Sequence, residues 1–390
     1  MRVLPVSPCL RLPAGLAGAF ALTFLTGESH AAFHGLGFLE TGTGLKYSEA
    51  MAISADGSTI VGGSSIDPSP EPDDDVFWSF RWTEATGMQA LPKSSEADVP
   101  LSRAYAVSAD GSVIVGQEFN MATGSADAYR WTAGGGLEVL PHLNPSLKAD
   151  TPWGVSGDGT RVVGGSPDTA FGWTSVDGTM PLPTAGCGCF SAAYGISADG
   201  STVVGVGSDG DVDVAYRWTV GGAEAIPVPA GSEVSEAYAA SANGATIVGM
   251  FQNSGLGGQQ AFAWTELGVV TLSTLDDDMT LGSSALAVSA DGEWAVGDSN
   301  GVAVVWNTRT GEVWDLKELL ISQGNTGLDD WTLQQANGIS ADGTKIIGTG
   351  LNAVGDTEAW VATITPVPEP SSFLLGGLAF TGALVRRRKH

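Results

Sequence analysis

Basic side chains are scarce in this chain. Only 17 lysines and arginines stand against 43 aspartates and glutamates, which gives a net charge of −26 at neutral pH. A surface this acidic repels phosphate backbones, so the composition argues against a nucleic-acid partner. No glycine-rich loop follows a strand and opens a helix, so the sequence predicts no nucleotide site either.

Histidine and cysteine are also rare, with four and three copies. Between the two targeting segments described below, only His34 and His142 remain, too few for a Ser-His-Asp triad or a multi-histidine metal site. We therefore predict no catalytic residues and a protein that is not an enzyme. Cys187 and Cys189 cannot build a disulfide scaffold, so the fold must rest on its core. They form a local disulfide, stay as thiols or bind a metal, and these alternatives are open.

Long apolar runs are confined to the two ends of the chain. Residues 12–25 form an apolar stretch that follows Arg2 and Arg11. Ser29 and Ala31 then place small side chains at the positions that a signal peptidase reads. We therefore predict a cleaved signal peptide over residues 1–31.

The second apolar run, residues 373–385, lies between a Pro-Glu-Pro triplet and a basic block. The residues of these two motifs are Pro368, Glu369, Pro370, Arg386, Arg387 and Arg388. Thirteen helical residues reach about 20 Å, less than the roughly 30 Å of a bilayer core, so we predict a short apolar helix that spans a membrane only marginally. The basic block favours the cytoplasmic side of that membrane.

This order of triplet, apolar run and basic tail over residues 366–390 resembles the PEP-CTERM sorting signal of Gram-negative bacteria. The resemblance implies that an exosortase recognises and removes the tail. It also implies a protein that is anchored transiently in the inner membrane and then delivered to the cell surface or the extracellular polysaccharide matrix.

Glycine is abundant, with 55 copies, and many of them lie in a turn that recurs seven times. The turn reads Ser-Ala-Asp-Gly, with SGDG and SANG as variants. Its third residues are Asp56, Asp110, Asp158, Asp199, Asn243, Asp291 and Asp342. Each turn is flanked by a segment such as AMAIS and a β-branched run such as TIVGG. A third segment ends in Trp, and a fourth follows a Gly with an apolar residue four positions later. Repeats of this length and make-up are typical of propeller blades.

The seventh repeat lacks a fourth segment after Trp360. The missing strand lies at the other end of the array, where Gly35 precedes Leu39 by four residues. We therefore predict an all-β, seven-bladed β-propeller over residues 32–365, closed by its N-terminal strand. Closure removes the open sheet edges that would otherwise aggregate.

The repeat is similar to the bacterial extracellular HAF repeat, through the stretch AFHGLGFL at residues 32–39 and through the SADG turn with its following Ile-Val-Gly. This resemblance implies an exported protein with a propeller-like array and adds little about chemistry.

The Asp of the recurring turn is expected to accept backbone hydrogen bonds, while the Gly supplies a positive φ. All seven turns fall on one face of the disc. The long irregular loops, which join second strands to third strands and one blade to the next, fall on the other face. We name this other face the loop face, and we predict that it carries the interactions of the protein, because function concentrates in loops held by a rigid scaffold.

Two acidic runs on the loop face are candidate contacts with extracellular polysaccharide or surface proteins. They consist of Asp73, Asp74, Asp75, Asp276, Asp277 and Asp278. A third loop alternates Asp209, Asp211 and Asp213, which are candidate Ca²⁺ ligands or a solvated acidic loop. No other cofactor is predicted. The sequence thus favours an exported structural or binding module. The alternatives are a carbohydrate-active hydrolase or lyase, and a glycan- or ice-binding protein.

Overall fold

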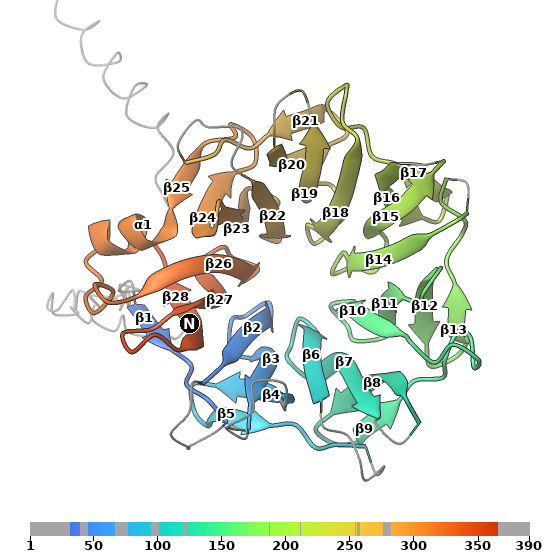
Figure 1. Cartoon of the computed structure of the whole chain (residues 1–390), viewed down its shortest axis with the longest axis horizontal. Helices are drawn as coiled ribbons and strands as arrows, with labels where there is room; N and C mark the ends of the chain where they lie inside the picture. Colours follow the sequence, from blue (N-terminus) through green and yellow to red (C-terminus); the bar gives the residue numbers. More distant parts are fainter. Residues whose placement is uncertain are drawn as a thin grey trace, which may run out of the picture.

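Seven antiparallel four-stranded sheets surround a central axis (Figure 1). The computed structural model describes residues 32–39, 46–66, 77–94, 101–120, 123–186, 188–210, 212–253, 255, 258–275 and 282–365. Six sheets are built from consecutive strands, and the seventh has the order β1-β28-β27-β26. The predicted all-β, seven-bladed propeller with a closing N-terminal strand is therefore confirmed. The predicted signal peptide and apolar C-terminal helix lie outside the described residues.

The strands fall into four concentric sets. The innermost strands are β2 (Ser48–Ile53), β6 (Leu101–Val107), β10 (Thr151–Val155), β14 (Ser191–Ile196), β18 (Val234–Ala240), β22 (Ser283–Val288) and β26 (Thr332–Ile339). The second strands are β3 (Ile60–Ser65), β7 (Val113–Asn120), β11 (Arg161–Gly165), β15 (Val203–Asp209), β19 (Ile247–Asn253), β23 (Trp294–Ser299) and β27 (Lys345–Leu351).

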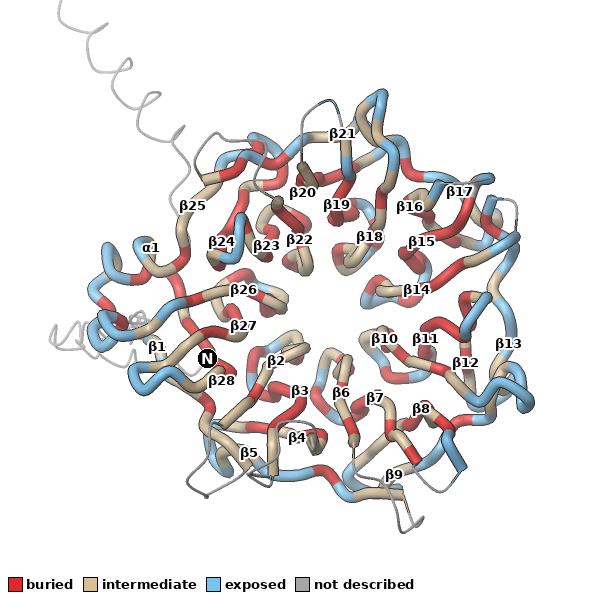
Figure 2. The backbone as a smooth tube through the Cα atoms, viewed as in Figure 1, coloured by how far each residue is buried: buried red, intermediate tan, exposed pale blue. Residues whose placement is uncertain are grey.

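The third strands are β4 (Phe77–Thr83), β8 (Ser125–Thr132), β12 (Ala170–Thr174), β16 (Val212–Thr219), β20 (Gly258–Thr265), β24 (Val302–Asn307) and β28 (Thr357–Thr363). The outermost strands are β5 (Gly87–Ala90), β9 (Gly136–Val139), β13 (Gly178–Pro181), β17 (Gly222–Ala225), β21 (Gly268–Thr271), β25 (Val313–Asp315) and β1 (Ala32–Gly35). Buried residues concentrate in the second and third strands, whereas the periphery is exposed (Figure 2).

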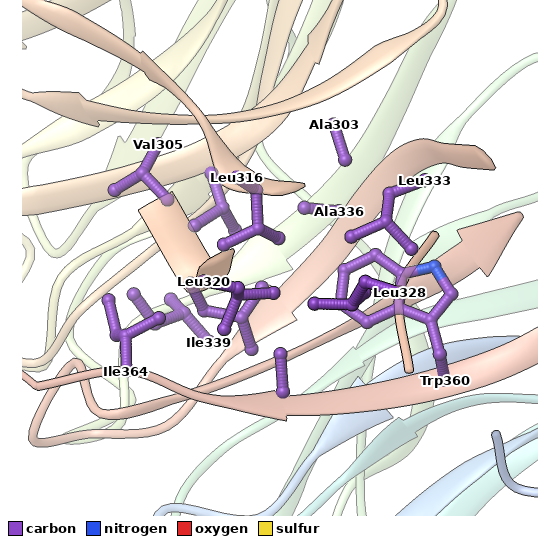
Figure 3. Packing of buried hydrophobic residues seen from close by; sticks show 13 residues of the cluster. Ala303, Val305, Leu316, Leu320, Leu328, Leu333, Ala336, Ile339, Trp360 and Ile364 are labelled. Carbon is purple, nitrogen blue, oxygen red and sulfur yellow. The ribbon is translucent and has the colours of Figure 1, made fainter. Parts of the chain in front are cut away.

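One short helix, α1 (Leu316–Ser322), follows β25 and was not predicted. Its N-cap is Asp315, whose carboxylate accepts the Glu318 amide at 3.0 Å. Leu316 and Leu320, four residues apart on one helix face, are fully buried in a cluster that also contains Trp360 (Figure 3). The helix therefore contributes to the core between the sixth and seventh blades.

The closing strand lies in a different register from the predicted one. The Leu36 amide donates to the Ala359 carbonyl at 2.8 Å, as the Leu91 amide donates to Ser79 in the first blade. Leu36, with 5 % exposure, therefore occupies the position of Leu91. The sequence had assigned that position to Leu39, which lies three residues further on and is only partly buried.

Trp360 is also displaced with respect to the other repeat tryptophans. Trp82 pairs with Ile60, two residues before Gly62, whereas Trp360 pairs with Gly348, the counterpart of Gly62. Ala362 takes the usual Trp position, and it pairs with Phe33 of the closing strand. The Phe33 ring lies 6.1 Å from the ring of Trp360, so an aromatic pair across two strands replaces the single Trp of the other blades.

The recurring turn has the predicted geometry. In the first blade, Asp56 accepts the Ser54 hydroxyl at 2.7 Å and the Ser58 amide at 2.9 Å, and Gly57 has a φ of 69°. The same two bonds recur in all seven turns, including the one in which Asn243 replaces Asp. The prediction that this residue organises a turn is confirmed.

The second residue of each turn links neighbouring blades. Its backbone donates to the equivalent carbonyl of the next blade at 2.9–3.1 Å, and the series closes when Ala341 donates to Ala55. In the fourth blade the donor is Asp199 instead of Ala198. The acceptors are Ala109, Gly157, Ala198, Ala242, Ala290, Ala341 and Ala55. A closed ring of seven backbone hydrogen bonds thus fastens the blades together at the turn face.

Replacing Asp110 by Asn is expected to reduce the acid sensitivity of the fold. Hydrogen bonds from Ser112, and then from Ser108, lower the pKa of Asp110 to about 2. A carboxyl group whose pKa is lower in the folded state than in the unfolded state stabilises the folded state at pH values above its unfolded pKa. This contribution is lost as the pH falls towards 2. The turn accepts an amide, as Asn243 shows. The difference in Tm between wild type and Asp110→Asn should therefore shrink from pH 5 to pH 2.5. A difference that stays constant over this range would show that the lowered pKa of Asp110 does not contribute to the stability of the fold.

Candidate ligand site on the propeller axis

A cavity of about 620 Å³ lies on the axis and is lined by residues from all seven innermost strands. Each of these strands has a β-bulge at the same point, between a buried residue, which is Ala in six strands and Pro152 in β10, and the next small residue of the repeat. In β2 the register shifts between Ala50 and Ala52, so Met51 is the extra residue. A bulge re-aims the side chain of the extra residue. Here it places that side chain in the cavity wall.

The seven bulged residues all line the cavity. They are Met51, Tyr105, Trp153, Tyr194, Tyr238, Leu286 and Asn337. All seven are half-buried, so each retains accessible surface. The residue after each bulge is Ala or Gly, as expected where strands converge, and Gly195 has no room for a β-carbon beside the Tyr238 carbonyl.

Three neighbouring aromatic rings make one side of the cavity. Trp153 and Tyr194 meet edge to face with ring centroids 5.2 Å apart, and Tyr194 and Tyr238 follow at 5.7 Å. Burial raises the pKa of both tyrosines, and the nearby Glu236 carboxylate raises it further. Burial also raises the pKa of Glu236 and that of Asp298. The aromatic wall is therefore apolar on its surface and acidic in its surroundings.

The opposite side of the cavity is polar. The Asn337 side-chain nitrogen donates to the Ala50 carbonyl at 2.8 Å and to Thr349 Oγ1 at 3.3 Å. Gln335 donates from Nε2 to Asp298 Oδ1 at 3.2 Å. These contacts use the amide nitrogens, whereas the amide oxygens accept no hydrogen bond from the residues that the structure describes. The two side chains are thus held in place with acceptor capacity left over.

Glu49 completes the polar side. Its carboxylate accepts the Tyr47 hydroxyl at 2.7 Å and pairs with the Arg103 guanidinium at 3.0 Å. Burial, followed by the Glu49 charge, raises the pKa of Tyr47. Glu49 is the only carboxylate among the described residues that line the cavity. Arg103 also lines an adjoining cavity of about 470 Å³, which shares Tyr105 with the axial one.

The glycine of each second strand makes the bulge possible. A β-carbon at Gly62 would overlap the Glu49 carbonyl, and one at Gly205 would overlap the Ala192 carbonyl. The same clash with the innermost strand occurs at Gly116, Gly164, Gly249, Gly297 and Gly348. The bulge brings the carbonyl two residues before the extra residue close to the second strand, and only glycine leaves space for it.

The axial cavity extends towards the loop face. Tyr47 and Gln335 precede the bulges, on the side where the innermost strands begin, whereas Ile53 and Ile339 mark the end near the turns. Beyond them lies a space of about 170 Å³ lined only by Ala, Gly, Val and Ile. The ring of backbone hydrogen bonds surrounds this narrow end. A ligand with polar groups therefore finds partners only in the part nearer the loop face.

The candidate calcium ligands lie in the hairpin between β15 and β16. Asp213 pairs with Ser208 and accepts its hydroxyl at 3.0 Å. Asp209 lies at the end of β15, and Asp211 is outside the described residues. Among the residues that the structure describes, no group of three or more His, Cys, Asp or Glu side chains is arranged to hold a metal ion. The structure therefore brings only part of this set into view.

Several other predicted site residues lie outside the described part of the chain. These are Asp73, Asp74, Asp75, Asp276, Asp277, Asp278, Cys187, Pro368, Glu369, Pro370, Arg386, Arg387 and Arg388. Cys189, in the connection between β13 and β14, is disulfide-bonded. Because Cys187 is not described, its pairing with Cys189 stays a prediction. No helix in the described ranges is long and apolar enough to cross a membrane.

Sequence reasoning missed the bulged residues. The signal was present in the segments AMAIS, AYAVS and PWGVS, whose second residue is large in every blade except where Asn337 stands. It was overlooked because regular alternation along a strand would place that residue between two sheets rather than on the axis. The bulge changes its direction, and a bulge leaves no mark on hydrophobic alternation alone.

Comparison with known proteins supports the sorting tail and the fold. Residues 366–389 match the PEP-CTERM protein-sorting motif, a signal for exosortase-dependent export to the cell surface of Gram-negative bacteria. No curated protein is significantly similar to this chain in sequence.

Several solved structures are similar to this chain in fold at low sequence identity. The β-propeller domain of the Trilobed protease from Pyrococcus furiosus matches with a TM-score of 0.52 and 10 % identity, over 85 % of this chain and 99 % of that one. An oligogalacturonate lyase in complex with manganese matches with a TM-score of 0.50 and 14 % identity, over 81 % and 88 %. TolB from Acinetobacter baumannii matches with a TM-score of 0.45 and 13 % identity over 80 % of this chain, which spans 65 % of TolB. At such identities the likeness shows the fold alone.

Proposed function

We propose that this protein is an exported, non-catalytic binding propeller, sorted through its PEP-CTERM tail and acting at the cell surface or in the extracellular matrix. One observation carries the binding role: a cavity of about 620 Å³, lined by aromatic rings on one side and amide groups on the other, extends towards the loop face. Such a cavity has the size and mixed lining of a ligand site. The acidic loops of the same face are proposed as its rim.

The lining of the cavity favours binding over hydrolysis. Most glycoside hydrolases use two carboxyl groups about 5–10 Å apart. Of the described residues in the cavity wall, Glu49 alone carries a carboxylate, and Tyr47 and Arg103 already engage it. The lyase fold neighbours carry no argument about chemistry at their low identity. A carbohydrate-active enzyme and an ice-binding protein stay alternatives to the binding role, and the similarity to HAF repeats stays a prediction.

A variant that fills the cavity tests the binding role. Leu286→Trp adds a large ring at a bulged position and leaves the loops of the loop face unchanged. We expect the wild-type protein to be retained by the surface material of the producing cells, and Leu286→Trp to lose most of this retention. Val139→Trp, on an exposed outer strand, is the matched control and should be retained like wild type. Equal retention of Leu286→Trp and wild type would contradict a role for the cavity.

The sorting tail is expected to be absent from the exported protein. Exosortase processing at the Pro-Glu-Pro triplet should leave a C-terminus near Pro368, without residues 371–390. Intact-mass spectrometry of the protein recovered from the cell surface measures this directly. A mass that includes the basic block Arg386–His390 would show that the tail is not removed.

Calcium is expected to have little effect on the described propeller. Asp213 already accepts the Ser208 hydroxyl, and the described residues contain no group of three or more His, Cys, Asp or Glu side chains that could hold a metal ion. We expect the Tm to change by less than about 2 °C in 5 mM CaCl₂. A true site with a Kd 100 times below this concentration would instead stabilise the folded state by about 2.7 kcal/mol, which corresponds to a rise in Tm of about 5 °C. A rise of more than about 5 °C that Asp213→Asn abolishes would instead establish a calcium site.

A further inference from the structure

We propose that the axial cavity selects an uncharged glycan, that is, an oligosaccharide of neutral pyranose units, and discriminates against polyuronates. This inference rests on the proposed binding function and names its ligand class. It follows from three features of the cavity: the continuous aromatic wall, the facing amides and the sign of the surrounding charge.

The aromatic wall matches the apolar face of a sugar ring. Trp153, Tyr194 and Tyr238 come from three consecutive blades. The ring centroids of Trp153 and Tyr194 are 5.2 Å apart, and those of Tyr194 and Tyr238 are 5.7 Å apart. Successive pyranose rings present C–H faces of similar extent, which pack on aromatic rings and leave the hydroxyl groups free at the edge. Tyr and Trp suit this role because each offers a large apolar body with a polar tip. The three rings, inclined to one another by 72° and 41°, thus form an aromatic wall that can contact more than one sugar unit.

The polar side matches the hydroxyl rim of the same ligand. Asn337 and Gln335 are held in place through their side-chain nitrogens. Their side-chain oxygens can therefore accept hydrogen bonds from sugar hydroxyl groups without a change of rotamer. Side chains that are held before a ligand arrives lose little entropy on binding. A purely apolar ligand would displace water from the amide oxygens without replacing its hydrogen bonds, and an unsatisfied acceptor in a desolvated site costs binding free energy. The cavity therefore suits a ligand that is apolar on one face and hydroxylated on its edge.

The charge around the cavity disfavours anionic sugars. Glu236 is hydrogen-bonded to Tyr238, and Asp298 is hydrogen-bonded to Gln335, so each side of the cavity has a carboxyl directly behind it. No lysine or arginine is among the described residues that line the axial cavity, and Arg103, at the adjoining cavity, is paired with Glu49. The whole chain carries a net charge of −26. A uronic-acid chain would bring carboxylates into this negative field, where the described lining offers no cationic side chain to receive them.

A glycan array probed with the purified exported protein tests the charge selectivity. We expect the bound oligosaccharides to be neutral. At low salt, a neutral hexamer from the bound set should have a Kd at least tenfold lower than that of the oligogalacturonate hexamer. Binding confined to acidic glycans, equal affinity for the two hexamers, or no binding to any glycan would overturn the inference.

Single-ring variants then test the location of the site. Trp153→Ala should weaken binding of the neutral hexamer roughly tenfold, as expected for the loss of one stacked ring. Tyr238→Phe keeps the ring and should stay within about threefold of wild type, which shows that the ring is what matters. Trp314→Ala, on the outer strand β25, is the matched control and should bind like wild type. Unchanged affinity of Trp153→Ala would overturn the inference.

The failure of this inference can be told apart from the failure of the binding role. If acidic glycans or a protein bind and Leu286→Trp abolishes that binding, the cavity is a ligand site with another ligand class. If no glycan binds and Leu286→Trp is retained on cells like wild type, both proposals fail.

Discussion

Replacing Leu36, which directly follows the closing strand β1, by Pro is expected to lower the Tm by about 6–12 °C and to open the ring. The substitution removes a side chain with 5 % exposure and the amide that donates to Ala359 at 2.8 Å. Loss of a buried Leu costs about 2–5 kcal/mol, and loss of the hydrogen bond adds about 1 kcal/mol. In a domain of this size, each kcal/mol corresponds to roughly 2 °C.

The matched control for this prediction is Leu91→Pro in the first blade. Leu91 is also buried and donates the equivalent hydrogen bond to Ser79. The strand before it, β5, however, continues from β4 through a short turn, whereas β1 pairs with β28 from the other end of the chain. Leu91→Pro should therefore loosen one blade edge, while Leu36→Pro should also expose β28 to limited proteolysis. Identical protease sensitivity of the two variants would show that closure by β1 does not hold the ring.

Replacing Gly205 by Ala is expected to destabilise the protein by about 3 kcal/mol and to disturb the axial cavity. The new β-carbon would overlap the Ala192 carbonyl, a backbone atom that cannot rotate away. The strand β14 could accommodate it only by giving up its bulge. Tyr194, the extra residue of that bulge, would then leave the cavity wall. We expect a lower Tm in thermal unfolding together with weaker binding of the cavity ligand.

Gly172→Ala controls for the general effect of adding a methyl group to a strand. Gly172 lies in β12. The atom nearest to a β-carbon added there is Cδ2 at the end of the flexible Leu182 side chain, 3.3 Å away. This variant should change the Tm by less than about 2 °C and leave ligand binding intact. If Gly205→Ala is as stable as Gly172→Ala, the glycines of the second strands do not serve the bulges.

The repeat architecture was predictable because it is written in the sequence seven times. The turn around Asp56 and Gly57 needs a hydrogen-bond acceptor and a positive φ, and only a few residue types supply these at that spacing. Closure was predictable from the unmatched segment at each end of the array. Both inferences use local chemistry together with counting, and neither depends on where a side chain points.

The registers at the closure were not predictable in the same way. Gly35 and Leu39 have the spacing of the other fourth strands, yet Leu36 takes the buried position. The reason is that Trp360 lies two residues earlier in β28 than the other repeat tryptophans, and Phe33 packs beside it. The seventh blade therefore fills its core with residues from both ends of the chain, and the repeat pattern alone contains no information about that arrangement.

The axial cavity was not predicted from the sequence, which only named the loop face as the candidate interaction face. The acidic loops that drew attention to the loop face are largely outside the described residues, whereas the axial cavity depends on bulges. One position of the repeat carries the variation: it is aromatic in Trp153, Tyr194 and Tyr238 and an amide in Asn337. The rest of the repeat holds these side chains in place. A propeller can thus change its ligand by substitution at a single repeat position while its blades stay the same.

A crystal structure of the exported protein with a neutral hexasaccharide from the bound set would show directly whether the axial cavity is the glycan site. We expect sugar rings packed on Trp153, Tyr194 and Tyr238, with their hydroxyl groups within hydrogen-bond distance of Gln335 and Asn337. Sugar bound only on the outer strands or on the turn face, with the axial cavity holding solvent alone, would contradict it.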